Sequence, residues 1–119
     1  MDRKYILLKD DTITHNDSTL YRIQAIRDFS NVKAGDLGGY VEREENLSHD
    51  GDCWVFDNAM ICNKAHLLDN AQVSDNACVS GNARVCGDSF VSDNACVSDN
   101  ACVSGNAHVY GDSSVSDDM

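Results

Sequence analysis

Residues 94–105 read NACVSDNACVSG and repeat one six-residue word almost unchanged. The word continues in both directions, and from Asp52 to Asp117 the chain divides into eleven consecutive hexads without insertion or deletion. The fourth position of every hexad is aliphatic, and the second is small, Ala in most hexads. Each junction between hexads holds Asn, Asp or Gly almost without exception. This regularity predicts a repeated shape.

The pattern favours short strands that turn a corner in every hexad. Positions two and four are two places apart, so both side chains point to the same face of a strand. Asn, Asp and Gly accept the left-handed backbone conformation that a corner needs. The sequence lacks the periodicity of a helix, and the words are too short for independent hairpins. Coils stacked in register would bury every aliphatic and small position, as in a β-solenoid.

The hexads resemble the hexapeptide repeat of the left-handed parallel β-helix, the fold of the trimeric LpxA-like superfamily. Upstream, DFSNVKAGDLGGYV (28–41) followed by LSHDGDCWVFDNA (47–59) resembles the amino-terminal signature of YdcK-like β-solenoid proteins. The resemblance implies three hexads per triangular coil, so that every third hexad returns to the same side. We therefore expect an all-β protein whose solenoid, residues 46–117, has about four coils: 46–63, 64–81, 82–99 and 100–117.

Residues 1–45 are expected to form a small β cap over the first coil, because a solenoid needs a covered end. The expected parts are strands in KYILL (4–8) and TLYRIQAIRDF (19–29), a polar loop in DDTITHND (10–17), a glycine-rich turn in AGDLGGY (34–40), and a solvated charged link in EREE (42–45). The degenerate hexad NLSHDG (46–51) would mark the transition into the solenoid.

Positions three and five of each hexad would point outward, in columns set by the three-hexad period. One face gathers aromatic side chains, which favours a partner-binding surface made of Trp54, Phe56, Phe90, His108 and Tyr110. One corner gathers Asp57, Asp75 and Asp93, which suit turns and also suit contacts with a basic partner. A third face, rich in Cys and Ser and poor in charge, favours packing between subunits.

The charge is strongly acidic and unevenly distributed. The chain has a formal net charge of −11, and residues 46–119 contribute −9 of it, from two basic and eleven acidic side chains. Such a surface disfavours direct contact with nucleic acid or an anionic membrane and favours a protein partner with a basic surface. No secretory or membrane-spanning segment is recognisable, which predicts a cytoplasmic protein whose six cysteines are reduced.

The sequence offers few signs of catalysis. It contains no CxxC or HxxxH spacing, and His66 and His108 fall on different faces of the expected solenoid as lone histidines. The hexads carry no inserted loop of the kind that shapes the sites of hexapeptide acyltransferases. We therefore expect no catalytic residues, no cofactor and no metal, and a protein that is not an enzyme.

The leading hypothesis is a non-enzymatic acidic binding protein. The resemblance to short YdcK-like proteins implies a phage or prophage setting, in which an acidic rod would suit an inhibitor of a nucleic-acid-binding host defence system, anti-CRISPR-like in its mimicry of nucleic acid. Two alternatives stay open. One is an acyltransferase-like enzyme of the hexapeptide superfamily. The other is a scaffold that forms homo-oligomers through a solenoid face or the uncapped coil 100–117.

Overall fold

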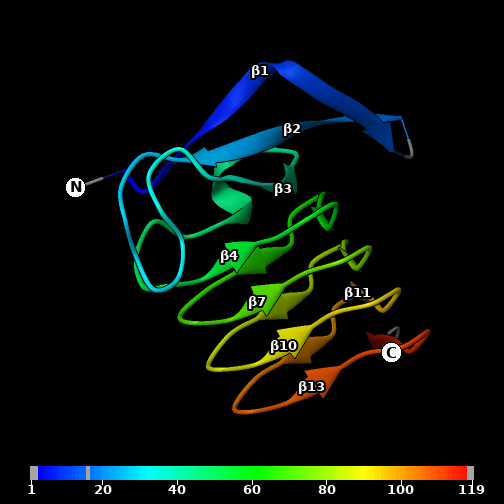
Figure 1. Cartoon of the computed structure of the whole chain (residues 1–119). Helices are drawn as coiled ribbons and strands as arrows, with labels where there is room; N and C mark the ends of the chain where they lie inside the picture. Colours follow the sequence, from blue (N-terminus) through cyan, green and yellow to red (C-terminus); the bar gives the residue numbers. More distant parts are fainter. Residues whose placement is uncertain (1–2, 16, 118–119) are drawn as a thin grey trace.

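The computed structural model describes residues 3–15 and 17–117, and nearly all regular structure in this part is β (Figure 1). The cap holds β1 (Tyr5–His15), β2 (Ser18–Ala25) and β3 (Leu37–Val41), followed by the short 3-10 helix η1 (Glu44–Asn46). No helix among these residues is long and apolar enough to cross a membrane.

Eleven short strands follow in the repeat region. They are β4 (Trp54–Val55), β5 (Met60–Ile61), β6 (His66–Leu67), β7 (Gln72–Val73), β8 (Cys78–Val79), β9 (Arg84–Val85), β10 (Phe90–Val91), β11 (Cys96–Asp99), β12 (Cys102–Val103), β13 (His108–Val109) and β14 (Ser114–Asp117).

The repeat region forms three parallel sheets, one on each side of a stacked coil. The sheets contain the strand sets β4-β7-β10-β13, β6-β9-β12 and β5-β8-β11-β14, and β1, β2 and β3 extend the last of them. Each rung lies three hexads beyond the previous one, as Val55 pairs with Val73 and Val73 with Val91. The β-solenoid fold class, with three strands per coil and about four coils, is confirmed.

The interior of the solenoid is made by the two inward positions of the hexad. Val73, Val79 and Val85 are fully buried, and so are the alanines at position two in these coils, such as Ala77. At the corners, the residues before each junction take the left-handed backbone conformation, for example Asp75 with φ 58°. Small inward side chains therefore let the three sheets approach, and Asp, Asn or Gly lets the chain turn between them.

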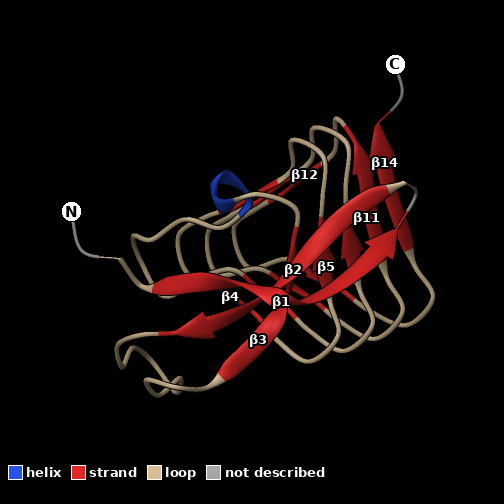
Figure 2. Cartoon of the chain, turned by 90° about the horizontal axis from the view of Figure 1, so that it is seen from above, coloured by secondary structure: helices blue, strands red, loops and turns tan. Residues whose placement is uncertain are grey.

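The hairpin of the cap is longer than the sequence predicted. Residues 10–15 of the expected loop lie in β1, and β2 begins at Ser18. The loop prediction is therefore wrong for most of its length. Asn16 lies outside the described residues. The extended hairpin lies across the sheet that contains β5 and β8 (Figure 2). Its Ile13 and Leu20 pack with Cys62 and Cys78, which supplies the apolar contact that keeps this end of the hairpin extended.

This contact covers part of the Cys/Ser face. Cys62 is buried, Met60 and Cys78 are half-buried, and Cys96 on the next coil is exposed. The chain's own cap therefore covers part of the first two coils of that face. Packing of this face between subunits stays a prediction.

The glycine-rich segment expected as a turn is mostly a strand. β3 pairs antiparallel with β2 and parallel with β5, so it forms the first rung of the long sheet. A Cβ at Gly38 would lie 2.6 Å from the carbonyl oxygen of Val55, and one at Gly39 would lie 2.6 Å from Val55 Cγ1. Because Gly38 and Gly39 have no side chain, the backbone of β3 can approach the first coil closely. The division into a cap of 1–45 and a solenoid of 46–117 as domains stays a prediction.

The first coil is longer than the regular coils by two positions. Tyr40 pairs with Met60 and Leu47 with Leu67, whereas Trp54 pairs with Gln72 at the regular spacing of three hexads. The expected coil 46–63 is therefore wrong in register before Trp54. The reason is that Leu47 takes the inward position above Leu67, because the other choice of register would place the imidazole of His49 in the apolar interior.

The close approach at β3 gives a stability prediction. Gly39→Ala should lower the free energy of unfolding by about 1–3 kcal/mol, since the added methyl group meets Val55 and the Ala59 carbonyl in a packed interior. Chemical denaturation measures the change. Ser98→Ala, on an outward position of the same sheet, should change stability by less than about 0.5 kcal/mol. Equal losses in both variants would contradict the close packing of β3 on the first coil.

Candidate functional site

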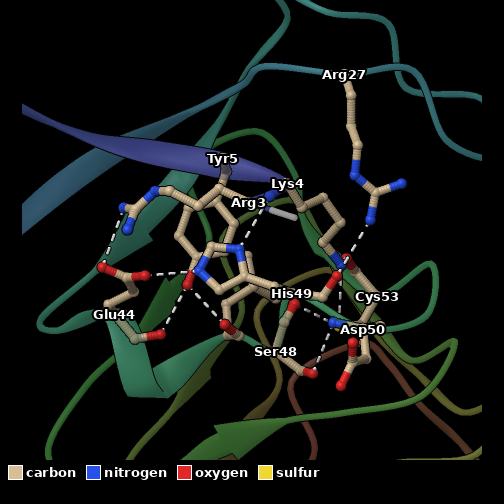
Figure 3. A network of polar contacts seen from close by, with 10 residues as sticks. Arg3, Lys4, Tyr5, Arg27, Glu44, Ser48, His49, Asp50 and Cys53 are labelled. Carbon is tan, nitrogen blue, oxygen red and sulfur yellow. Dashed lines mark hydrogen bonds and ion pairs between the residues drawn. The ribbon is translucent and has the colours of Figure 1, made fainter. Parts of the chain in front are cut away.

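Because the first coil is longer by two positions, His49 lies outside the solenoid interior and contacts the cap (Figure 3). Its ring stacks on that of Tyr5, with centroids 4.3 Å apart and planes at 15°. Nδ1 accepts the backbone N–H of Lys4 at 3.0 Å, so the proton of the neutral ring is on Nε2, which donates to Glu44 Oε2 at 2.7 Å. This hydrogen bond, helped by Arg3, lowers the pKa of the Glu44 carboxyl. Both ring nitrogens of His49 are therefore engaged.

Lys4 belongs to the cap, and its side chain covers the end of the solenoid interior at the first coil. Its side chain is fully buried, and Nζ donates to the carbonyl oxygens of Cys53 (2.7 Å) and Gly51 (3.3 Å) and to Cys53 Sγ (3.4 Å). Nζ also lies 4.8 Å from the ring centroid of Phe29. Burial lowers the pKa of Lys4 and raises that of the Cys53 thiol. The three acceptors offset much of the cost of burying an ammonium group.

Two polar side chains fix η1 against the first coil. The Tyr5 hydroxyl donates to the carbonyl oxygens of Glu44 (2.7 Å) and Leu47 (2.6 Å), which share its single proton. The buried amide of Asn46 accepts the backbone N–H of Arg43 at 2.8 Å and donates to the carbonyl oxygen of Ala65 at 2.8 Å. The short helix is thus held from both sides, and the residues on it have fixed positions.

His66 is oriented by this helix. Its Nδ1 lies 2.8 Å from the carbonyl oxygen of Glu45. A carbonyl oxygen only accepts, so Nδ1 carries the proton and Nε2 holds the lone pair of the neutral ring. Nε2 makes no hydrogen bond within residues 3–15 and 17–117. The half-buried ring is therefore a positioned imidazole with its basic nitrogen available.

His66 and Glu45 both line two adjoining hollows between the cap and the solenoid. The larger has a volume of about 590 Å³ and is lined by Glu44, Glu45, Leu47, Ser48, His49, His66 and Leu68. The smaller has a volume of about 290 Å³ and is lined by Arg43, Glu45, Asn46, Lys64 and His66. Both glutamates and Leu68 thus line the larger hollow, whereas Arg43 and Lys64 line the smaller hollow together with Glu45. We call the pair of hollows the cap groove.

Trp54, the first of the expected partner contacts, is buried. Only 1% of its surface is exposed, because the cap loop places the ring of Phe29 edge-on to it at 5.3 Å. Phe56 is half-buried and packs against the core. The prediction that Trp54 is an outer contact is therefore wrong, since the cap covers the first rung of that face.

The lower rungs of the same face remain open. The exposed fractions are 37% for Phe90 and 64% for Tyr110, and the exposed ring of His108 lies 4.9 Å from that of Phe90. These three residues lie on or next to β10 and β13, in a different sheet from His66. The structure does not bring the aromatic patch into the cap groove, and its role in partner binding stays a prediction.

The expected aspartate column exists at one corner of the solenoid. Asp57 Oδ2 accepts the backbone N–H of Asp75 at 3.2 Å, Asp75 Oδ2 accepts that of Asp93 at 3.1 Å, and Asp93 Oδ2 accepts that of Gly111 at 3.0 Å. Each carboxylate thus braces the corner of the next coil, and all three residues are exposed. Within the described residues, no group of three or more His, Cys, Asp or Glu side chains is arranged to hold a metal ion.

Comparison with known proteins identifies similar sequences. Residues 71–87 match the family model described as the YdcK β-solenoid repeat. A curated relative, the uncharacterized acetyltransferase YdcK of Escherichia coli (strain K12), is 35% identical over 69 residues, which are 57% of this chain and 21% of the relative. The chain thus spans about a fifth of the relative's length.

The comparison contradicts the prediction that this protein is not an enzyme, because the relative is named an acetyltransferase. The prediction rested on lone histidines, and the structure shows that His66 is not alone. His49, Glu44 and Glu45 lie beside it, and the sequence analysis missed all three as site residues. One signal was available: NLSHDG places His at the fourth position, where every later hexad is aliphatic. EREE, taken as a solvated link, supplies the two glutamates.

The buried lysine gives a prediction about pH. Lys4→Met should destabilise the fold by about 1–3 kcal/mol at pH 7, because the carbonyls of Gly51 and Cys53 lose their donor. The pKa of Lys4 lies below its ordinary value of 10.5, so between these values the unfolded chain binds more protons and the Lys4 contribution rises with pH. The stability difference between wild type and Lys4→Met should therefore grow as the pH is raised from 7 towards 10.5.

Urea denaturation at several pH values tests this dependence. Lys33→Met, which removes an exposed lysine, should show a difference from wild type that does not vary with pH. A difference for Lys4→Met that shrinks as the pH rises would contradict the burial of an ammonium group at this position.

Proposed function

We propose that this protein takes part in acyl transfer from a thioester, with the cap groove as the site and His66 as the general base. The observation that carries the proposal is the hydrogen bond from His66 Nδ1 to the Glu45 carbonyl, which leaves Nε2 as a positioned base in a hollow of about 590 Å³. The similarity to a protein named an acetyltransferase supports an acetyl group as the transferred unit.

The proposed step is nucleophilic substitution at the thioester carbonyl. The acceptor's oxygen or nitrogen attacks the carbonyl carbon while His66 Nε2 takes its proton. The bond between carbon and sulfur then breaks, and the proton passes to the departing thiolate, so the products are an ester or amide and a free thiol. Ser48 Oγ accepts the backbone N–H of Asp50 at 3.1 Å, so its own hydrogen can be donated to the developing oxyanion in the groove.

His49 has a different role in this proposal. Its Nδ1 is occupied by the Lys4 backbone and its Nε2–H by Glu44, so it does not compete as a base. It is a positioning residue that ties η1 to the cap and so keeps the Glu45 carbonyl over His66. Of the two histidines that line the groove, the proposal gives proton transfer to His66, whose Nε2 makes no hydrogen bond among the described residues.

His66→Gln tests the proposal. With acetyl-coenzyme A as donor and a panel of amines and alcohols as acceptors, product formation followed by chromatography should fall about 10²–10⁴-fold in kcat, the usual contribution of a general base. The matched control is His108→Gln, an exposed histidine on another face that should keep wild-type activity. Equal activity of wild type and His66→Gln would remove His66 as the base.

We propose a second function on a separate observation: binding of a basic protein partner along the acidic corner. Asp57, Asp75 and Asp93 repeat at each coil with their carboxylates exposed, and the chain's net charge of −11 extends the field around them. The exposed rings of Phe90 and Tyr110 would supply apolar contact. A phage or prophage inhibitor of a nucleic-acid-binding defence system would present these carboxylates to the basic surface that otherwise binds nucleic-acid phosphates.

Salt dependence tests this second function. The affinity for a purified basic partner should fall steeply between about 50 and 500 mM NaCl, because screened charges at the corner no longer attract it. The triple variant Asp57→Asn, Asp75→Asn, Asp93→Asn keeps oxygens for the backbone bonds and should weaken binding at low salt only. Affinity that does not change with salt would contradict binding through the acidic corner.

A further inference from the structure

We propose that the acyl acceptor is an aliphatic diamine, with one ammonium group held by Glu45 and the other nitrogen presented to His66. This inference rests on the proposed acyl transfer and names the substrate class of the same site. It follows from how charge is distributed over the cap groove, from the partners of each carboxylate, and from the chemistry of an amine nucleophile.

The two carboxylates of the larger hollow differ in their partners. Glu44 is compensated, because Arg3 lies 3.1 Å from Oε1 and His49 donates to Oε2. Glu45 makes no ion pair among the described residues, and its side chain is exposed. Glu45 is therefore the carboxylate in this hollow that is left to attract a cation from solution.

Glu45 is also adjacent to the base through its own backbone. The carbonyl oxygen of Glu45 holds His66 Nδ1, and the two residues line both hollows together. A cation bound by the Glu45 carboxylate would thus lie in hollows that His66 also lines. The half-buried Leu68 provides apolar surface in the larger hollow, which suits the methylene stem of an aliphatic chain.

The smaller hollow carries a mixed charge, because Glu45 lines it together with Arg43 and Lys64, and Arg43 is ion-paired with Glu42 at 3.2 Å. Residues 46–119 contain only two basic side chains, and one of them, Lys64, lines this hollow with Arg43. Lys64 makes no ion pair among the described residues, so on a chain of net charge −11 it is the side chain of this hollow that can attract the anionic groups of a thioester donor. The carboxylates and Leu68 of the larger hollow then suit the acceptor. The imidazole of His66 lies between the two.

The chemistry requires two nitrogens. A carboxylate stabilises the ammonium form of a bound amine, and an ammonium has no lone pair with which to attack a carbonyl. An acceptor with a single amine bound by Glu45 would therefore be held in its unreactive form. In a diamine, one ammonium stays at Glu45 while the second nitrogen, after losing one proton to solvent, attacks the thioester carbon. That nitrogen gives its next proton to His66 Nε2, the C–S bond breaks, and the thiolate takes the proton, which leaves an amide and a thiol.

The test compares 1,4-diaminobutane, n-butylamine and 1-butanol as acceptors, with acetyl-coenzyme A as donor and the full chain as enzyme. Wild type should use the diamine with a kcat/KM at least about tenfold above that of n-butylamine. Glu45→Gln should raise the KM for the diamine about tenfold with kcat within about twofold of wild type, because it removes ground-state binding and keeps the backbone carbonyl that orients His66. Asp10→Asn, which removes one exposed charge outside the groove, is the matched control and should match wild type.

The outcomes separate the two proposals. A preference for n-butylamine or 1-butanol, or a Glu45→Gln variant that keeps wild-type KM for the diamine, overturns the diamine assignment while acyl transfer by His66 stands. A Glu45→Gln variant that loses kcat and keeps KM also overturns it, because such a change would show a role in orienting the base and not in holding a cation. Absence of transfer to all three acceptors in wild type overturns both proposals.

Discussion

The backbone ladder between successive coils is the constraint on which the rest of the structure depends. The N–H of Phe56 bonds to the carbonyl of Val73 at 2.7 Å, that of Ser74 to Val91 at 2.8 Å, and that of Ser92 to Val109 at 2.8 Å. Because each coil satisfies the polar groups of its neighbour, a change of length within one coil would leave buried groups unpaired. The three-hexad period therefore holds from Trp54 onward, and equivalent side chains stack.

Among the described residues, no regular coil precedes the first coil. Other groups therefore bond to the backbone along its upper edge. β3 supplies a rung to one sheet, and the side chains of Lys4, Tyr5 and Asn46 supply hydrogen bonds to carbonyl groups of this part of the chain. Buried polar side chains thus concentrate at the junction of cap and solenoid, because this is where the ladder ends. The rest of the interior is almost entirely Val and Ala.

The candidate site also lies at the junction of cap and solenoid, and it also results from the end of the backbone ladder there. The extra length of the first coil falls where no regular coil lies above, so the ladder tolerates it, and it carries His49 to Tyr5 and Glu44. The helix η1, held by Asn46, then places a carbonyl against Nδ1 of His66. The groove around His66 is consequently a product of the irregular junction, whereas the regular coils present flat faces with exposed side chains such as Phe90.

The sequence by itself determined the solenoid, because a strict repeat of Val and Ala with Asn, Asp or Gly at every junction leaves few other ways to bury the apolar positions. It also located the aspartate column, whose spacing is the period of the coil. Only the tertiary structure decided the length of the hairpin, the burial of Trp54 and the partners of His66, since each depends on contacts between residues of the cap and coils far along the chain. The irregular junction has no repeat to constrain it, so its geometry follows from which polar groups find partners there.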